Sequence, residues 1–195
     1  MLIRFRALLA LFLTAWLSQA ALAASPPPKF VPATLAERSY NDPAMHYIAP
    51  AGVVLLMKHH VPYQSATQMT PVAIWGFDPG KRKARVITIS FQAASGSSLD
   101  DFYSAFIGAM RAANSGDLFS AKRTAQLSNG MPAYWVNIRH GSGFSEYRIY
   151  GYVWYDGARG VALIEQGRFG EIGEEQARMD LAGASAVAYP VGRDY

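Results

Sequence analysis

Three parts of the sequence carry side chains that could act as acids, bases or nucleophiles. His140 lies near Ser142 and Ser145, and glutamates stand at Glu146 and Glu165. Two carboxylates or a histidine can perform acid–base chemistry, and a like-charge pair raises the pKa of one member. The serines lack the Gly-x-Ser-x-Gly elbow that exposes a nucleophile. We interpret their segment as a glycine turn, and we keep a cell-envelope hydrolase using Glu146, Glu165 and His140 as one alternative.

Arg148 gives the same glutamates a simpler explanation. A two-residue turn centred on Asp156-Gly157 would place Arg148 opposite Glu165 on neighbouring strands. A cross-strand ion pair needs only this register, whereas catalysis needs a site around it. We therefore predict an ion pair of Arg148 and Glu165, and no catalytic residue.

Metal ligands are sparse, because the chain contains four histidines and no cysteine. Adjacent His59 and His60 would point to opposite faces of a strand, so they could not chelate one ion there. A metal site would have to pair one of them with Asp42 or Asp78. No P-loop or complete Gly-x-Gly-x-x-Gly motif occurs. We predict no metal and no cofactor.

Aromatic side chains concentrate between residues 134 and 155. The set consists of Tyr134, Trp135, Tyr150, Tyr152, Trp154 and Tyr155. Such rings stack on sugars, which makes a glycan-binding module a second alternative, but they also fill sheet cores and bury about 150–250 Å² each. We favour core packing. The ligand-binding candidates of the sequence are Tyr150, Tyr152 and Trp154, with Arg148 and Glu165.

The element that would position these residues is a meander of four antiparallel strands between Ala121 and Gly167. Asn129-Gly130 and Asp156-Gly157 mark two of its turns, because these dipeptides accept positive φ angles. The expected register leaves the middle of the sheet apolar on both faces. A sheet with two apolar faces needs two covers.

Two helices are expected to supply those covers. Ser98 and Asp101 resemble a capping box that opens a helix ending at Asn114, and a weaker helix is predicted from Glu171 to Val187. Further strands are expected over residues 52–59, 70–77 and 83–92. The order predicts an α+β fold, a three-layer α/β/α sandwich with a mainly antiparallel sheet of about six or seven strands.

The N-terminus has the three parts of a secretory signal peptide. Arg4 and Arg6 precede an apolar run, and cleavage is expected after Ala23 or Ala24. Loss of the two arginines lowers the formal net charge from +4 to +2, too little to indicate nucleic acid as a partner. We assign residues 1–23 to the signal, 24–44 to a Pro-rich linker and N-terminal extension, and 45–195 to a single domain. The expected location is the periplasm or the medium, with no stable membrane span after cleavage.

Four segments together resemble the PsbP/Mog1-like (DcrB-like) exported domains, over roughly Met45 to Tyr189. The segments are residues 47–52 (Tyr-Ile-Ala-Pro-Ala-Gly), the helix start Ser98-Leu99-Asp100, residues 129–135 (Asn-Gly-Met-Pro-Ala-Tyr-Trp), and residues 150–161. The resemblance implies an α/β/α sandwich that acts mostly as an accessory or binding module, generally not as an enzyme. No binding residue of the family carries over to this chain. The first hypothesis is therefore an exported, non-catalytic accessory or binding protein, with an envelope protein as its expected partner.

Overall fold

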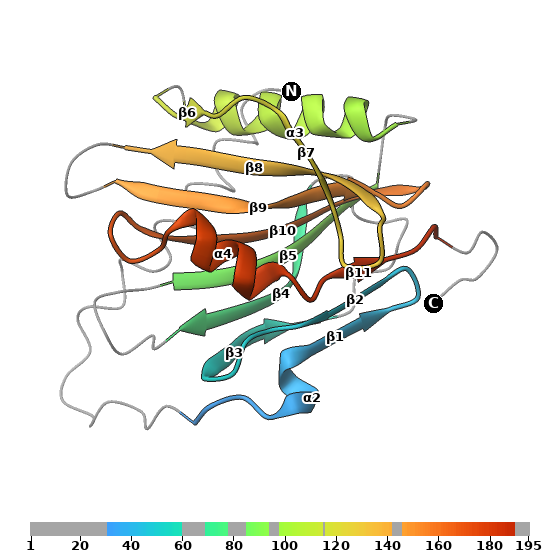
Figure 1. Cartoon of the computed structure of the whole chain (residues 1–195), viewed down its shortest axis with the longest axis vertical. Coiled ribbons are helices and arrows are strands. Elements are labelled where there is room, and N and C mark those ends of the chain that lie inside the picture. The colour runs from blue at the N-terminus through green and yellow to red at the C-terminus, as the bar shows by residue number, and fades with distance from the viewer. Residues whose placement is uncertain are drawn as a thin grey trace.

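The computed structural model describes residues 31–59, 69–77, 85–93, 98–114, 116–141 and 146–189. The predicted signal peptide and residues 78–80, whose sequence Asp-Pro-Gly is typical of a turn, lie outside the described residues. Strands make up 51% and helices 20% of the described chain. In order, the elements are α2 (Leu35–Arg38), β1 (Ser39–Asp42), β2 (Met45–Ile48), β3 (Val53–Lys58), β4 (Thr70–Phe77), β5 (Arg85–Ala93), α3 (Leu99–Ala113), β6 (Leu118–Phe119), β7 (Arg123–Gln126), β8 (Pro132–His140), β9 (Tyr147–Tyr155), β10 (Arg159–Arg168), α4 (Glu174–Leu181) and β11 (Ser185–Ala186) (Figure 1). No described helix is both long enough and apolar enough to cross a bilayer.

A single large antiparallel sheet dominates the fold. Its eight strands run in the order β3-β4-β5-β10-β9-β8-β6, and β7 pairs with β8 beside β6 (Figure 1). The predicted meander is confirmed as the consecutive pairs β7–β8, β8–β9 and β9–β10. The other three strands form a small antiparallel sheet in the order β1-β2-β11.

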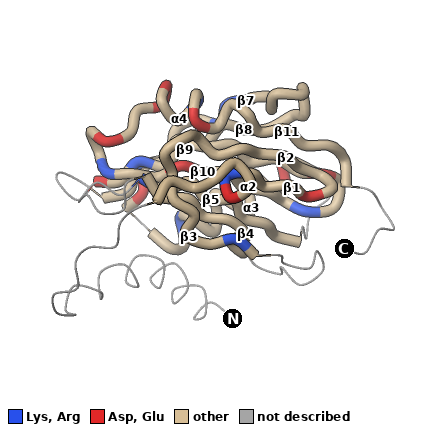
Figure 2. Tube along the Cα trace, turned by 90° about the horizontal axis from the view of Figure 1, so that it is seen from below, with Lys and Arg blue, Asp and Glu red and all other residues tan. Residues whose placement is uncertain are grey.

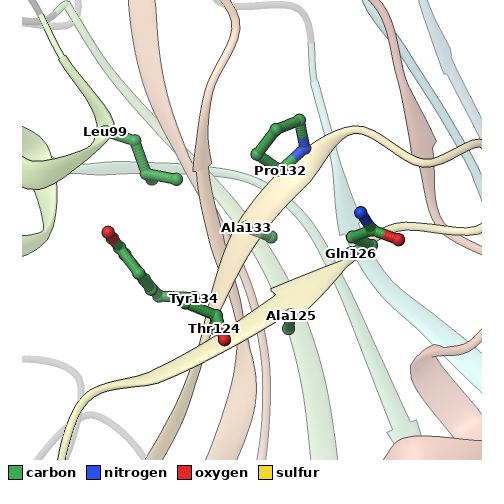
Figure 3. Close-up of a pocket in the computed structure, with 7 residues that line it drawn as sticks. All are labelled: Leu99, Thr124, Ala125, Gln126, Pro132, Ala133 and Tyr134. Atoms are coloured by element: carbon green, nitrogen blue, oxygen red, sulfur yellow. The ribbon is translucent and has the colours of Figure 1, made fainter.

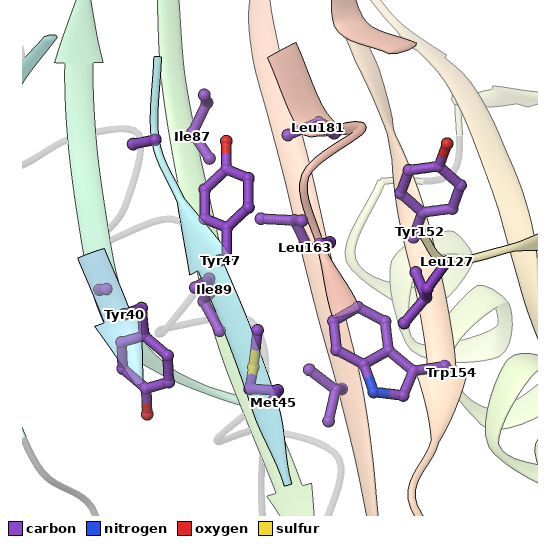
Figure 4. Close-up of a cluster of buried hydrophobic side chains, with 14 of the residues drawn as sticks. Tyr40, Met45, Tyr47, Ile87, Ile89, Leu127, Tyr152, Trp154, Leu163 and Leu181 are labelled. Carbon is purple, nitrogen blue, oxygen red and sulfur yellow. The ribbon is translucent and has the colours of Figure 1, made fainter. Parts of the chain in front are cut away.

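The two faces of the large sheet are covered differently. On one face, the small sheet and α4 close a core in which Tyr47 and Leu181 pack with Ile89, Leu163 and Trp154 (Figure 4). On the other face lies α3, whose buried residues Phe102, Phe106 and Ile107 pack against β8, β9 and β10. The predicted start of α3 is confirmed, since the Ser98 hydroxyl accepts a hydrogen bond from the Asp101 amide at 3.1 Å.

The predicted three-layer α/β/α sandwich is wrong, because the fold is β-rich. The segment before residue 50 contains residues typical of turns, such as Asn41-Asp42-Pro43, and most of it was assigned to the linker and N-terminal extension. It forms the β1–β2 hairpin instead, and its alternate residues Tyr40, Met45 and Tyr47 are buried under the large sheet. The second helix has eight residues, so the small sheet supplies most of the cover that we expected from it. α2 and β1 also lie within residues 24–44, which we had assigned to the linker and extension.

The predicted register of the β9–β10 hairpin is shifted by two residues. Gly160 pairs with Tyr155 and Glu165 pairs with Tyr150, where we expected Arg148 opposite Glu165. The cause is a turn displaced by one residue: the Asp156 amide donates to the Arg159 carbonyl at 3.1 Å, so residues 157 and 158 form the turn. The Asp156 side chain holds this turn by accepting hydrogen bonds from the amides of residues 158 and 159 at 3.1 and 2.8 Å. Because a shift of two residues preserves the alternation of side chains, each residue keeps its predicted face.

Gly160 allows α3 to approach the sheet closely. A Cβ atom at this position would lie 2.1 Å from the ring of Phe102. Phe102 is buried, so its ring has little room to move. We predict that Gly160→Ala lowers the free energy of unfolding by about 1–3 kcal/mol through overpacking. Urea denaturation monitored by circular dichroism measures this change.

Gly108 provides a matched control within α3 itself. A Cβ atom there would meet no atom within 4 Å, and the residue is exposed. Gly108→Ala should therefore raise the free energy of unfolding by about 0.5–1 kcal/mol, the difference in helix propensity. Equal effects of the two substitutions would contradict the close contact between Gly160 and Phe102.

Candidate binding site

An open groove lies where the N-terminal end of α3 meets the β7–β8 hairpin, and we call it the α3–β7 groove. Its volume is about 510 Å³. The lining residues come from all three elements and are Leu99, Thr124, Ala125, Gln126, Pro132, Ala133 and Tyr134 (Figure 3). The lining combines apolar surface from Leu99 and Pro132 with the amide of Gln126 and the hydroxyls of Thr124 and Tyr134. Such a lining can accept a mixed polar and apolar chain.

β7 forms one wall of the groove, and β8 is its one partner strand in the described chain. The Leu127 amide donates to the Met131 carbonyl at 3.0 Å, which makes these residues a hydrogen-bonded pair. Bonded and non-bonded pairs alternate along an antiparallel ladder, so Ala125 bonds to β8 while Thr124 and Gln126 do not. The backbone N–H and C=O groups of Thr124 and Gln126 therefore point away from β8, toward the open edge.

A charged and aromatic cluster forms the rim of the groove. The Lys122 ammonium bonds to Asp100 and lies 4.3 Å from the centre of the Tyr134 ring. The Tyr134 hydroxyl donates to the same carboxylate at 2.8 Å, and the Tyr103 ring packs edge-on at 5.0 Å. The hydrogen bond from Lys122, followed by that from Tyr134, lowers the pKa of Asp100. The cluster fixes the rim and keeps the Asp100 carboxylate charged.

Glu165 lies on the central strand β10 and is fully buried. Its ion-pair partner is Arg85 of β5, whose Nε donates to Glu165 Oε1 at 2.8 Å and whose Nη2 also bonds to Asp180 of α4. Burial raises the pKa of Glu165 to about 7, with Arg85 opposing this rise and Asp180 adding to it. The predicted ion pair between Arg148 and Glu165 does not form. A pKa near 7 would suit an acid or base catalyst, but this carboxyl has no exposed surface that a substrate could reach.

Arg148 binds a different glutamate. Its Nε lies 2.6 Å from Glu146 Oε1, and Arg139 Nε lies 3.1 Å from the other oxygen of the same carboxylate. Arg139 and Arg148 are direct cross-strand partners on β8 and β9. Glu146 and Glu165 therefore belong to two separate clusters, so the structure does not bring together the carboxylate pair that a hydrolase would use.

The aromatic candidates of the meander lie in the core. Tyr150, Tyr152 and Trp154 are 6%, 8% and 0% exposed, and Trp135 is fully buried as well. Trp135 contacts the Tyr152 ring edge-on at 4.8 Å. A glycan site needs several rings exposed together, and these four fill the space under α4 and the small sheet instead. The two partly exposed members of the aromatic set are Tyr155 and Tyr134, and Tyr134 lines the groove.

Among the described residues, no group of three or more histidine, aspartate and glutamate side chains could hold a metal ion. His140 Nδ1 contacts Asp117 Oδ1 at 2.5 Å, with the Asp117 side chain fully buried, but the serines at 142 and 145 lie outside the described residues. His59 is exposed, and His60 and Asp78 lie outside the described residues. Asp42 bonds to Arg159.

Sequence reasoning missed one buried charge cluster entirely. Arg159 of β10 donates through Nε to Asp156 at 2.7 Å and through Nη1 to Asp42 at 3.0 Å. Its guanidinium lies 3.8 Å from the centre of the Phe91 ring. Asp42 and Arg159 are 117 residues apart, so no local pattern could reveal the pair. The cluster joins the small sheet to the large one.

No protein-family model and no curated protein matches the chain. The resemblance to PsbP/Mog1-like domains therefore depends on the four quoted segments alone. The candidate site is accordingly defined by geometry, and its centre is the open edge of β7 beside the α3–β7 groove.

Proposed function

We propose that the protein is an exported, non-catalytic accessory protein that binds an extended segment of a partner protein along the open edge of β7. The observation that carries the proposal is the outward direction of the backbone groups of Thr124 and Gln126 beside the groove. An added strand gains affinity from main-chain hydrogen bonds and specificity from pockets for alternate side chains. The α3–β7 groove is such a pocket.

The charges near this edge favour a bound strand over self-association. Lysine and arginine on an edge strand commonly prevent pairing between sheets. Here Lys122 is bonded to Asp100 and Arg123 to Glu174, so both side chains are held away from the edge at Thr124 and Gln126. A ligand strand would therefore find the backbone groups of Thr124 and Gln126 accessible next to two neutralised cations.

The alternatives receive less support from the same residues. The hydrolase hypothesis needs an acid and a base open to substrate, yet Glu165 and Glu146 are buried in separate ion pairs. The glycan hypothesis needs exposed rings, yet Tyr150, Tyr152 and Trp154 are buried. The accessory role implied by the family resemblance belongs to the same class as the binding function proposed here.

Proline at position 124 tests the proposal. The Thr124 amide does not bond to β8, so Thr124→Pro should leave the ladder intact while it removes one donor and adds a ring at the edge. We predict that affinity for peptides selected against the native protein from a phage-displayed random library falls at least about tenfold, equivalent to about 1.4 kcal/mol. Fluorescence anisotropy of labelled peptides measures the change.

Thr124→Val is the matched control, because valine keeps the shape of the side chain and the backbone amide. Its affinity for the selected peptides should stay within about threefold of the native value, since the side-chain hydroxyl contributes little to strand addition. Equal losses in the two variants, or a selection that enriches no peptide, would contradict the proposal.

A further inference from the structure

A second charged surface lies at the other end of β8, away from the α3–β7 groove. Arg139 and Arg148 stand directly opposite each other on β8 and β9. Like charges directly opposite each other on neighbouring strands repel and destabilise the pair unless an opposite charge lies close by. Glu146 does so: its carboxylate receives one arginine on each oxygen, at 3.1 and 2.6 Å. One carboxylate between two guanidinium groups leaves the trio with a net charge of +1.

The contacts with Glu146 use only a small part of each guanidinium group. Both are made by Nε, and neither Nε has a well-aligned hydrogen-bond partner in the described chain. The Glu146 side chain is 8% exposed, whereas those of Arg139 and Arg148 are 41% and 23% exposed. The carboxylate thus lies beneath the two arginines, which face the solvent above it. Each guanidinium retains donors for a second partner.

Neighbouring side chains hold Arg148 in place. Its guanidinium lies 5.1 Å from the centre of the Phe169 ring, and it also interacts with Tyr150 on the same strand. The next carboxylate along this face, Glu174, is itself bonded by Arg123 and Arg178. Glu174 is therefore already paired with two other arginines, and basic and acidic segments lie close together beside α4 (Figure 2). A fixed, positively charged surface requires little reorganisation to bind an anion.

We infer that Arg139 and Arg148 together bind a phosphate group. The oxygens of a tetrahedral phosphate point in different directions, so separate oxygens can contact two separate guanidinium groups. A carboxylate is planar and matches one guanidinium fork better than two. The phosphate can belong to a small molecule or to a lipid headgroup, because the chemistry of the contact is the same.

Thermal unfolding in sodium phosphate, acetate and chloride at equal ionic strength tests the inference. A ligand that binds only the folded state raises the unfolding midpoint. We expect a rise in phosphate beyond that in acetate or chloride, and its loss in Arg139→Gln and Arg148→Gln. Arg111→Gln, which changes an exposed arginine on α3, should keep the full rise.

Glu146→Gln keeps the experiment decisive if loss of an arginine impairs folding. This variant removes the negative charge beneath the arginines, so phosphate should bind several-fold more tightly, as measured by isothermal titration calorimetry. If the ion trio has a purely structural role, Glu146→Gln should bind phosphate no more tightly than the native protein.

Sedimentation with phosphatidylcholine vesicles, with and without phosphatidylglycerol, distinguishes a lipid headgroup from a small molecule as the source of the phosphate. Binding that requires phosphatidylglycerol and both arginines indicates a lipid headgroup. The inference is overturned if neither the native protein nor Glu146→Gln binds phosphate or anionic vesicles, or if the arginine variants bind as the native protein does.

Discussion

Replacing Arg159 with methionine is expected to lower the free energy of unfolding by about 3–5 kcal/mol, the usual effect of removing one member of a buried ion pair. Arg159 is 3% exposed, and its partners Asp42 and Asp156 are 9% and 1% exposed. Methionine fills a similar length of space but leaves two buried carboxylates without their cation. Burial already raises the pKa of Asp156 against the effect of Arg159. Chemical denaturation at pH 7 measures the loss.

The penalty should come mainly from the orphaned carboxylates, and a combined variant separates this cause from lost packing. Adding Asp42→Asn and Asp156→Asn to Arg159→Met removes both charges and should recover a large part of the stability. Arg111→Met, on the exposed face of α3, should change stability by less than about 1 kcal/mol. If the single variant unfolds like the native protein, the cluster does not join the small sheet to the large one.

Stability is expected to fall as the pH rises through 7, because of Glu165. The pKa of this carboxyl is about 7 in the folded protein and 4.5 in its ordinary state, so folding favours the protonated form. With respect to this group the fold is most stable below about pH 5 and loses about 1–3 kcal/mol between pH 5 and pH 8.5. The facing charged and titratable groups are Arg85 on β5, Asp180 on α4 and Tyr47 on β2. Urea denaturation across this range measures the slope.

Glu165→Gln should remove this pH dependence, because glutamine does not titrate. At pH 8.5 the variant should equal or exceed the native protein in stability, since the native protein then holds two carboxylates on one arginine. Glu175→Gln, which alters an exposed glutamate of α4, should keep the native slope. A native slope in Glu165→Gln would mean that other groups cause the dependence.

The predictable parts of the fold are those that depend on residues close together in the sequence. The meander follows from turn dipeptides such as Asn129-Gly130 and from dense aromatic and β-branched residues. The start of α3 follows from Ser98 and the acidic residues after it. Each of these signals spans a few residues, and the residues that cause the turn or the helix cap are the same residues that form it.

The parts that were missed depend on contacts between distant segments. The β1–β2 hairpin is short and interrupted by Asp42-Pro43, and its burial is decided by the large sheet beneath it. Glu165 pairs with Arg85, 80 residues away, because β10 lies beside β5 in the sheet. The displaced β9–β10 turn puts Tyr150, and not Arg148, opposite Glu165 on the other side. In sequence, Arg85 belongs to a basic run with Lys81, Arg82 and Lys83, which is typical of a solvated loop. No local pattern distinguishes it from its neighbours.

The candidate site also has one feature that the sequence predicts and one that it does not. Polar residues dominate the segment from Ala121 to Leu127, which is typical of a peripheral strand, and β7 does form an edge. Which residues of β7 bond to β8 (its hydrogen-bonding phase) was not predictable. This phase depends on the three-residue turn closed by the Leu127 and Gly130 amides. The phase decides that Thr124 and Gln126, and not Ala125, offer their backbone groups to a ligand.

Residue-resolved amide hydrogen exchange by NMR tests this central claim most directly. In the free protein the amides of Thr124 and Gln126 should exchange rapidly, while those of Arg123 and Ala125, which bond to β8, should be protected. A saturating selected peptide should protect Thr124 and Gln126 and leave the other two unchanged. If Thr124 and Gln126 are protected before any peptide is added, or stay unprotected when it is bound, β7 does not receive an added strand.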